Sequence, residues 1–146
     1  VKAHKDKLPK IANLFNRDGG PEPPVGISVP QAMYDDFVKI SEPIQKIRPD
    51  YPFEVKVREP RKRPTRMGGT DASVFAIEGV PTLGFTTEDF KGYDFDYGEI
   101  WHTERDLYTK NIPEYQEHTA TVTAIIALGV ANLDKQLSRE GLYTEE

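Results

Sequence analysis

The sequence contains no cysteine, and no apolar run in it approaches the roughly 18 residues of a membrane-spanning helix. The absence of cysteine excludes disulfides and thiolate metal sites, so any metal must be held by carboxylate and imidazole groups. Histidine is scarce, with three copies, and tryptophan occurs once. The net charge of −5 gives no general attraction to nucleic acid. We therefore expect neither a membrane span nor a nucleic-acid partner.

The residues that are present indicate one folded domain covering residues 1–146. A chain of 146 residues is long enough to bury a real core, and 37% of it is hydrophobic, with seven Tyr and seven Phe. Strand and helix patterns alternate along the chain, which predicts the α/β class.

The first half predicts two strands and a helix. The run Lys10–Asn16 is apolar and stops at "RDGG", which indicates a strand ended by a turn. Residues 33–47 carry apolar side chains at three- and four-residue steps, as on one face of a helix, and Pro43 predicts a kink or break there. Residues 51–59 alternate apolar and charged side chains, which is typical of a strand with one wet face.

Around the middle of the chain, a basic loop precedes a short helix and a strand. Residues 72–79 predict the helix, with Gly79 as its end, and residues 80–86 predict a buried strand. The loop contains interleaved prolines, which favours an exposed segment over an anion-binding site. Its cations are Arg58, Arg61, Lys62, Arg63 and Arg66.

The last element has the clearest pattern. Asn111, Pro113 and Glu114 are arranged as in a capping box, with proline in the first turn. An apolar stripe at helical spacing then predicts a helix running to about Ser138.

Two residues are candidates for metal binding. Asp18 follows a predicted strand, and open α/β sheets build their sites at the carboxyl ends of strands. His102 lies on a loop beside the only tryptophan, and a neutral imidazole there is a good zinc ligand. The alternatives are a turn aspartate and a solvated histidine. Asp71 either supports the site or caps the helix that follows it.

The other acidic and histidine residues are weaker candidates. We expect His118 on an exposed turn of the last helix and His4 in a charged terminus. Asp94 and Asp96 form a D-x-D without the surrounding ligand spacing of a calcium loop, so they are interpreted as a solvated run.

Two linked motifs resemble those of the co-catalytic zinc exopeptidases, the family of bacterial leucyl aminopeptidases and glutamate carboxypeptidases. "GGTDASVFAIEGVP" is similar to the family segment G-[ST]-D-H-x-x-F-x-x-x-G-[IV]-P, and "WHTERD" is similar to its later H-T-x-x-D loop. "IANLFNRDGG" resembles a strand ending in Asn-x-Asp-x-x-Gly. The matching positions are Asp18, Gly69, Thr70, Asp71, Phe75, Gly79, Val80, Pro81, His102, Thr103 and Asp106.

The resemblance implies a fold and a site. The chain would be the C-terminal half of a three-layer αβα fold with a mixed, mostly parallel sheet. Asp18 would bind one of two zinc ions and His102 the other. Asp71, Thr103 and Asp106 would support the site, together with Trp101. The implied substrate is a peptide or aminoacyl compound, and many relatives are exported to the periplasm or the outside of the cell.

Part of the family pattern is not in this chain. The H-x-D ligand pair and the Glu-Glu pair, which includes the general base, are expected upstream of Val1. His4 and Asp6 form an H-x-D by chance, because no room remains for Glu-Glu before the strand of Asp18. We therefore expect the isolated chain to be inactive and to bind zinc weakly or not at all. The missing N-terminal half would leave open edges, which predicts a homo-oligomer.

Two alternatives remain. Glutaminyl cyclases share the scaffold, use one zinc ion and also place Trp before His-Thr, but Ala72 and Val74 depart from their D-H-x-P-F-like pattern. Metal-free binding or structural relatives, of the transferrin-receptor type, are the other possibility. Ala72 points toward them, whereas retention of both Asp18 and His102 points away.

Overall fold

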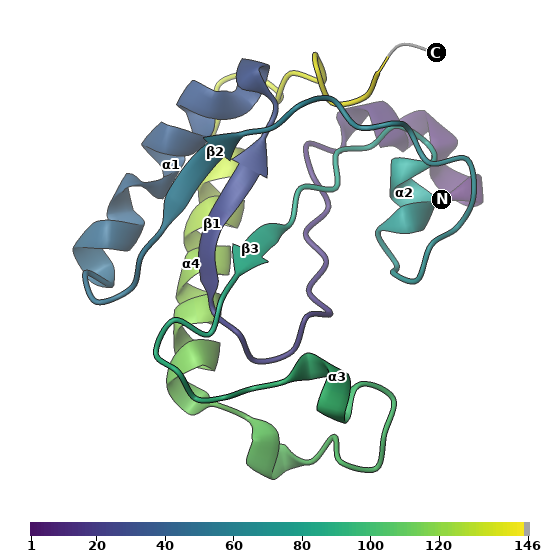
Figure 1. The fold of residues 1–146 in the computed structure, drawn as a ribbon. Coiled ribbons are helices and arrows are strands. Elements are labelled where there is room, and N and C mark those ends of the chain that lie inside the picture. Colours follow the sequence, from purple (N-terminus) through teal and green to yellow (C-terminus); the bar gives the residue numbers. More distant parts are fainter. Residues whose placement is uncertain (145–146) are drawn as a thin grey trace.

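The computed structural model describes residues 1–144 as a small α/β domain (Figure 1). A three-stranded sheet is flanked by two longer helices, and shorter helical turns lie in the connections. The strands are β1 (Pro24–Val29), β2 (Glu54–Val57) and β3 (Phe85–Thr87). The helices are α1 (Tyr34–Ile47), α2 (Ser73–Ala76), α3 (Tyr97–Ile100) and α4 (Pro113–Ala131), with 3-10 turns at Lys2–Lys10, Gln31–Met33 and Tyr108–Lys110.

The sheet is mixed, with the strand order β2-β1-β3. β1 runs parallel to β2, with Ile27 opposite Val55, and antiparallel to β3, with Ile27 opposite Phe85. The helix α1 connects the parallel pair, as parallel strands require a crossover. Glu54 and Lys56 lie two residues apart on the same face of β2, are exposed and form an ion pair of 3.0 Å.

The core lies between the sheet and the two longer helices. Ile27 and Val29 of β1 are buried against apolar side chains of α1 and α4. The helices α1 and α4 also pack on one another, and the side chain of Ile40 lies where a Cβ atom at Gly129 of α4 would be. Within residues 1–144, no helix is long and apolar enough to cross a membrane.

The helix and strand predictions are mostly confirmed for α1, β2 and α4, with corrected ends. α1 continues through Pro43 without a break. α4 ends at Ala131, short of the predicted Ser138, because the chain turns at Asn132. The strand predicted for residues 80–86 is limited to β3, and the helix predicted for residues 72–79 is one turn, α2. Gly79 follows that turn with a positive φ of 76°.

Pro113 lies in the first turn of α4 as predicted, but the predicted capping residues are wrong. Ile112 stands at the N-cap of α4, and no side chain there accepts a capping hydrogen bond. Asn111 donates to Gln116 instead, and Glu114 bonds to residues of the preceding loop. At α2 the N-cap is Ala72, so Asp71 does not cap the turn.

The strand predicted for Lys10–Asn16 is also absent. The segment lies beside residues 81–83, but it shares only one backbone hydrogen bond with them, from Leu14 to the carbonyl of Pro81. Asn13 makes the other contacts through its side chain. Its Oδ1 accepts from the amide of Leu83 at 2.8 Å, and its Nδ2 donates to the carbonyl of Leu83 at 3.3 Å. A side-chain amide thus replaces the backbone ladder.

Candidate metal centre

One open cavity of about 940 Å³ has both candidate ligands in its lining. Asp18 and His102 both line it, although they come from segments far apart in the sequence. Asp18 lies after the N-terminal extended segment, and His102 lies after α3, in the long connection between β3 and α4. Figure 1 shows this connection crossing below the sheet before it enters α4. Gly69 and Thr70 of the Gly-Gly-Thr-Asp motif line the same cavity.

The turn that carries Asp18 is held by polar contacts. The Nδ2 of Asn16 donates to the Asp18 carboxylate at 2.7 Å, which orients one of its oxygens. Arg17 donates to the carbonyls of Gly20 and Glu22 and so draws the following residues into a compact turn. The other carboxylate oxygen of Asp18 remains available on an exposed side chain.

Gly20 lies where the turn of Asp18 meets the connection that carries His102. Its φ is 72°, and a Cβ atom at this position would lie 3.0 Å from the ring of Phe95 and 3.2 Å from that of Tyr97. Only glycine combines the left-handed backbone with such an approach. The turn after Asp18 therefore contacts the connection that carries His102.

His102 adopts an unusual backbone conformation. Its φ is 56°, in the left-handed region that costs a non-glycine residue on the order of 1 kcal/mol. Trp101 packs against the imidazole, with ring centroids 4.6 Å apart and tilted by 44°. Thr103 secures the turn, because its hydroxyl donates to the carbonyl of Ile100 at 3.0 Å and accepts from the amide of Arg105 at 3.2 Å.

The supporting residues expected from the sequence divide into two groups. Trp101 and Asp106 line the cavity with His102. Asp71 is exposed and does not line it, while Thr103 acts on the turn rather than on the cavity. Carboxylate and imidazole are suitable zinc donors, but a closed structural site needs four ligands. Across residues 1–144, no three His, Asp or Glu side chains gather closely enough to hold a metal ion.

His118 differs most from its sequence prediction. It is fully buried instead of exposed, and its ring stacks on Tyr51 with centroids 3.9 Å apart. Its Nε2 donates to the carbonyl of Pro24 at 3.0 Å, so that this nitrogen carries the proton. Burial lowers the pKa of His118, and the nearby charges of Arg48 and Lys91 lower it further. The ring is therefore neutral at pH 7.

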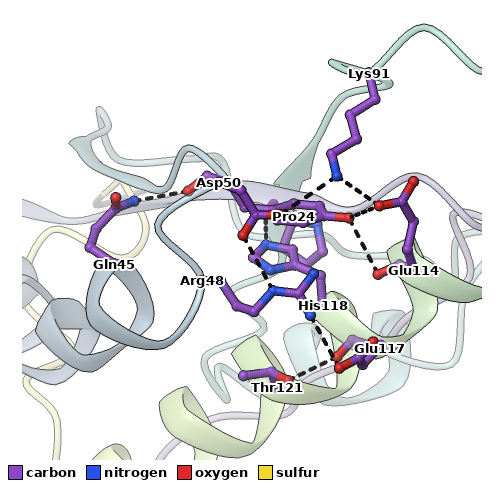
Figure 2. A network of polar contacts seen from close by, with 10 residues as sticks. Pro24, Gln45, Arg48, Asp50, Lys91, Glu114, Glu117, His118 and Thr121 are labelled. Carbon is purple, nitrogen blue, oxygen red and sulfur yellow. Dashed lines mark hydrogen bonds and ion pairs between the residues drawn. The ribbon is translucent and has the colours of Figure 1, made fainter.

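Figure 2 shows the polar groups that surround His118. Arg48 pairs with Asp50 at 3.7 Å and with Glu117 at 3.4 Å, and Lys91 pairs with Glu114 at 2.7 Å. The guanidinium of Arg48 and the ammonium of Lys91 both lie over the ring of Tyr51. Sequence patterns gave no sign of this network, because its members come from segments that are distant along the chain.

The basic loop forms no part of the cavity around His102. Arg63 donates twice to the carbonyl of Ile77, and Arg58 donates to the carbonyl of Glu59. These contacts fix the loop against α2 and its own backbone, as expected for an exposed structural segment.

Comparisons with family models, curated proteins and solved structures found no match to this chain.

Proposed function

We propose that this chain is the C-terminal part of a zinc-dependent exopeptidase of the aminopeptidase type. The observation that carries the proposal is the shared cavity of Asp18 and His102, the two residues that motif resemblance assigns to metal binding. Their donor atoms suit zinc in a protein without cysteine. One donor for each of two ions leaves most ligand positions of both ions open, so the remaining ligands and the general-base glutamate would come from a preceding segment.

Under this proposal, each residue of the cavity has a defined task. When bound, zinc supplies Lewis acidity toward a water molecule and the scissile carbonyl. Asp18 would hold one ion with the oxygen that Asn16 leaves free, and His102 would hold the other. Trp101 restrains the imidazole ring, and Thr103 restrains the backbone beneath it. The substrate would be a peptide or aminoacyl compound that enters the cavity.

The proposed architecture is the C-terminal half of a three-layer αβα fold. The mixed three-stranded sheet, with α1 and α4 packed against it, is compatible with one helix layer and part of the sheet. The preceding segment would supply the rest of the sheet and the other helix layer.

A glutaminyl-cyclase-like enzyme is the second candidate. The observation in its favour is Trp101, which is 57% exposed and lines the cavity directly beside His102. Ala72 and Val74 remain against it. Cyclisation of N-terminal glutamine and hydrolysis of an aminoacyl anilide are separate assays, so one protein preparation distinguishes the two reactions.

The test uses the longer polypeptide that includes the preceding segment. Zinc content and hydrolysis of aminoacyl anilides are measured for the parent and for Asp18→Asn and His102→Gly, with His4→Ala as the matched control. We expect about two zinc ions per chain. Each ligand variant should lose metal and at least about 100-fold in rate, since even residues that only orient ligands cost up to this much. A metal-free, inert parent would contradict the proposal and favour a binding module.

A further inference from the structure

The connection between β3 and α4 is long, and its two ends are joined by a set of polar contacts. It begins after Thr87, ends at Pro113 and contains α3, His102 and one 3-10 turn. Its helical turns are short, and long irregular loops in compact domains are often functional. Because a free loop of this length has many conformations, contacts that close its ends restrict the positions of every residue between them.

The first contact joins Asp89 to Tyr115. The Tyr115 hydroxyl donates to Asp89 Oδ1 at 2.6 Å and accepts from the backbone amide of Lys91 at 2.9 Å. The same Asp89 carboxylate accepts from the amides of Tyr93 and Phe95. Tyr115 is fully buried, and this burial, together with Asp89, raises its pKa to about 12, so the hydroxyl remains a donor.

The second contact joins Lys91 to Glu114. Their side chains pair at 2.7 Å, and both are partly shielded, with 28% and 34% exposure (Figure 2). The hydrogen bond that Lys91 donates to Glu114 lowers the pKa of Glu114 and raises the pKa of Lys91, so both remain charged at pH 7. The hydroxyls of Tyr51 and Tyr93 also donate to the Glu114 carboxylate. The Asp89–Tyr115 and Lys91–Glu114 contacts thus join the first residues of the connection to the first turn of α4, and Tyr51 adds a bond from the segment after α1.

Contacts further along the connection are mostly local to it. Glu99 pairs with Arg105 at 3.7 Å and with Lys110 at 3.4 Å, which folds the middle of the connection onto itself. Ile100 is a buried apolar residue of the connection. Gly20, outside the connection, lies against the rings of Phe95 and Tyr97. The middle part is therefore folded largely on itself, and it contacts the rest of the domain through its two ends and through Gly20.

We propose that Asp89, Lys91, Glu114 and Tyr115 act together as a clamp that positions His102 at the cavity. The four side chains are positioning residues, because none of them lines the cavity. They hold the connection at its beginning and end, and the turn of His102 follows the placement of the unit between. For metal binding, the inference rests on the proposed function; for the placement of the connection, it does not.

The test compares Tyr115→Phe and Lys91→Met with the unchanged chain Val1–Glu146. Tyr115→Phe removes one hydroxyl and keeps the buried ring, and Tyr143→Phe, whose hydroxyl bonds to Val80, is the matched control. Hydrogen exchange is followed in residues 97–107, where the amides of Trp101 and Thr103 are hydrogen-bonded, and in residues 122–130 of α4. The single tryptophan, Trp101, reports on the same region by fluorescence.

Each clamp variant should speed exchange in residues 97–107 about five- to tenfold, as expected for the loss of one net hydrogen bond, and should leave residues 122–130 unchanged. Trp101 should become more accessible to acrylamide. Unchanged exchange in residues 97–107, or an equal rise in both regions, would overturn the inference. In the longer polypeptide of the proposed function, Tyr115→Phe should also weaken the affinity for zinc. If that protein binds no zinc while the exchange result holds, the proposed function fails and the clamp stands.

Discussion

The imidazole of His118 stacks on the ring of Tyr51 with 3.9 Å between centroids, in a place that excludes solvent from both side chains. The pair connects the body of α4 to the segment after α1. Its Nε2 bonds to the Pro24 carbonyl, while Nδ1 has no hydrogen-bond partner in the described part of the chain. A proton added at Nδ1 would therefore be a buried charge without an acceptor.

The first prediction concerns stability in mild acid. Burial, Arg48 and Lys91 lower the pKa of His118 in the folded state, while Asp50 and the Pro24 carbonyl raise it less. Below about pH 6.5 the unfolded chain therefore binds more protons than the folded chain. The contribution of neutral His118 to the free energy of unfolding is complete above that pH and is lost as pH falls toward the folded pKa of His118. The free energy of unfolding should fall by up to about 1.4 kcal/mol per pH unit in this window.

Urea unfolding between pH 7.5 and 5 measures this slope. His118→Gln keeps a donor for Pro24 and removes the titration, so its unfolding free energy should change less with pH. His4→Gln, an exposed histidine, should behave like the unchanged chain. Equal slopes in all three proteins would show that the buried histidine does not control acid stability.

The second prediction concerns the contact that Gly20 makes between the turn of Asp18 and the connection that carries His102. Gly20→Ala introduces a Cβ atom 3.0 Å from Phe95 at a φ of 72°. Gly92→Ala is a matched control, since Gly92 has a φ of 73° and nothing within 4 Å of the same position. Both substitutions should cost about 1 kcal/mol of backbone strain, and only Gly20→Ala should also shift Trp101 fluorescence. Identical spectra for both variants would mean that the Asp18 turn does not position the connection.

The third prediction concerns the contact between α1 and α4. A Cβ atom at Gly129 would lie 2.4 Å from Cγ2 of Ile40 and 3.0 Å from its Cγ1. Gly129→Ala should therefore destabilise by about 1–3 kcal/mol through overpacking, reduced by up to about 1 kcal/mol from the better helix propensity of alanine. In an Ile40→Ala background the same substitution should be neutral or stabilising. A double-mutant cycle by urea unfolding measures the coupling, and additive effects would contradict it.

The sequence predicted the parts of this fold that depend on local pattern. The apolar stripes of α1 and α4 and the alternation in β2 each follow from one short window. The strand prediction for the segment of Asn13 was wrong because strand formation depends on a partner. The side-chain amide of Asn13 bonds to Leu83, and the backbone ladder does not form. The predicted exposure of His118 was wrong for a related reason, since the residues that contact its ring, Tyr51 and Pro24, are remote in sequence.

The candidate site was predictable to a similar extent. Motif spacing singled out Asp18 and His102, and both line one cavity. Asp71 lies in the same motif as Thr70, yet only Thr70 reaches the cavity, because side-chain direction in a turn is not encoded in the spacing. The clamp was invisible in the sequence, since Lys91 and Tyr115 lie on opposite sides of the connection that they close.

The last prediction concerns the backbone of His102. Its φ of 56° strains any residue with a Cβ atom, so His102→Gly should stabilise the chain by up to about 1 kcal/mol, whereas His102→Ala should be neutral or destabilising. Thermal unfolding of the two variants measures the difference. In the longer protein both variants should lose zinc and activity equally, because both lack the imidazole. A gain in stability together with a loss of metal would show that the strained turn is retained for the ligand and not for the fold. If glycine gives no gain over alanine, the left-handed conformation at His102 carries no strain and says nothing about function.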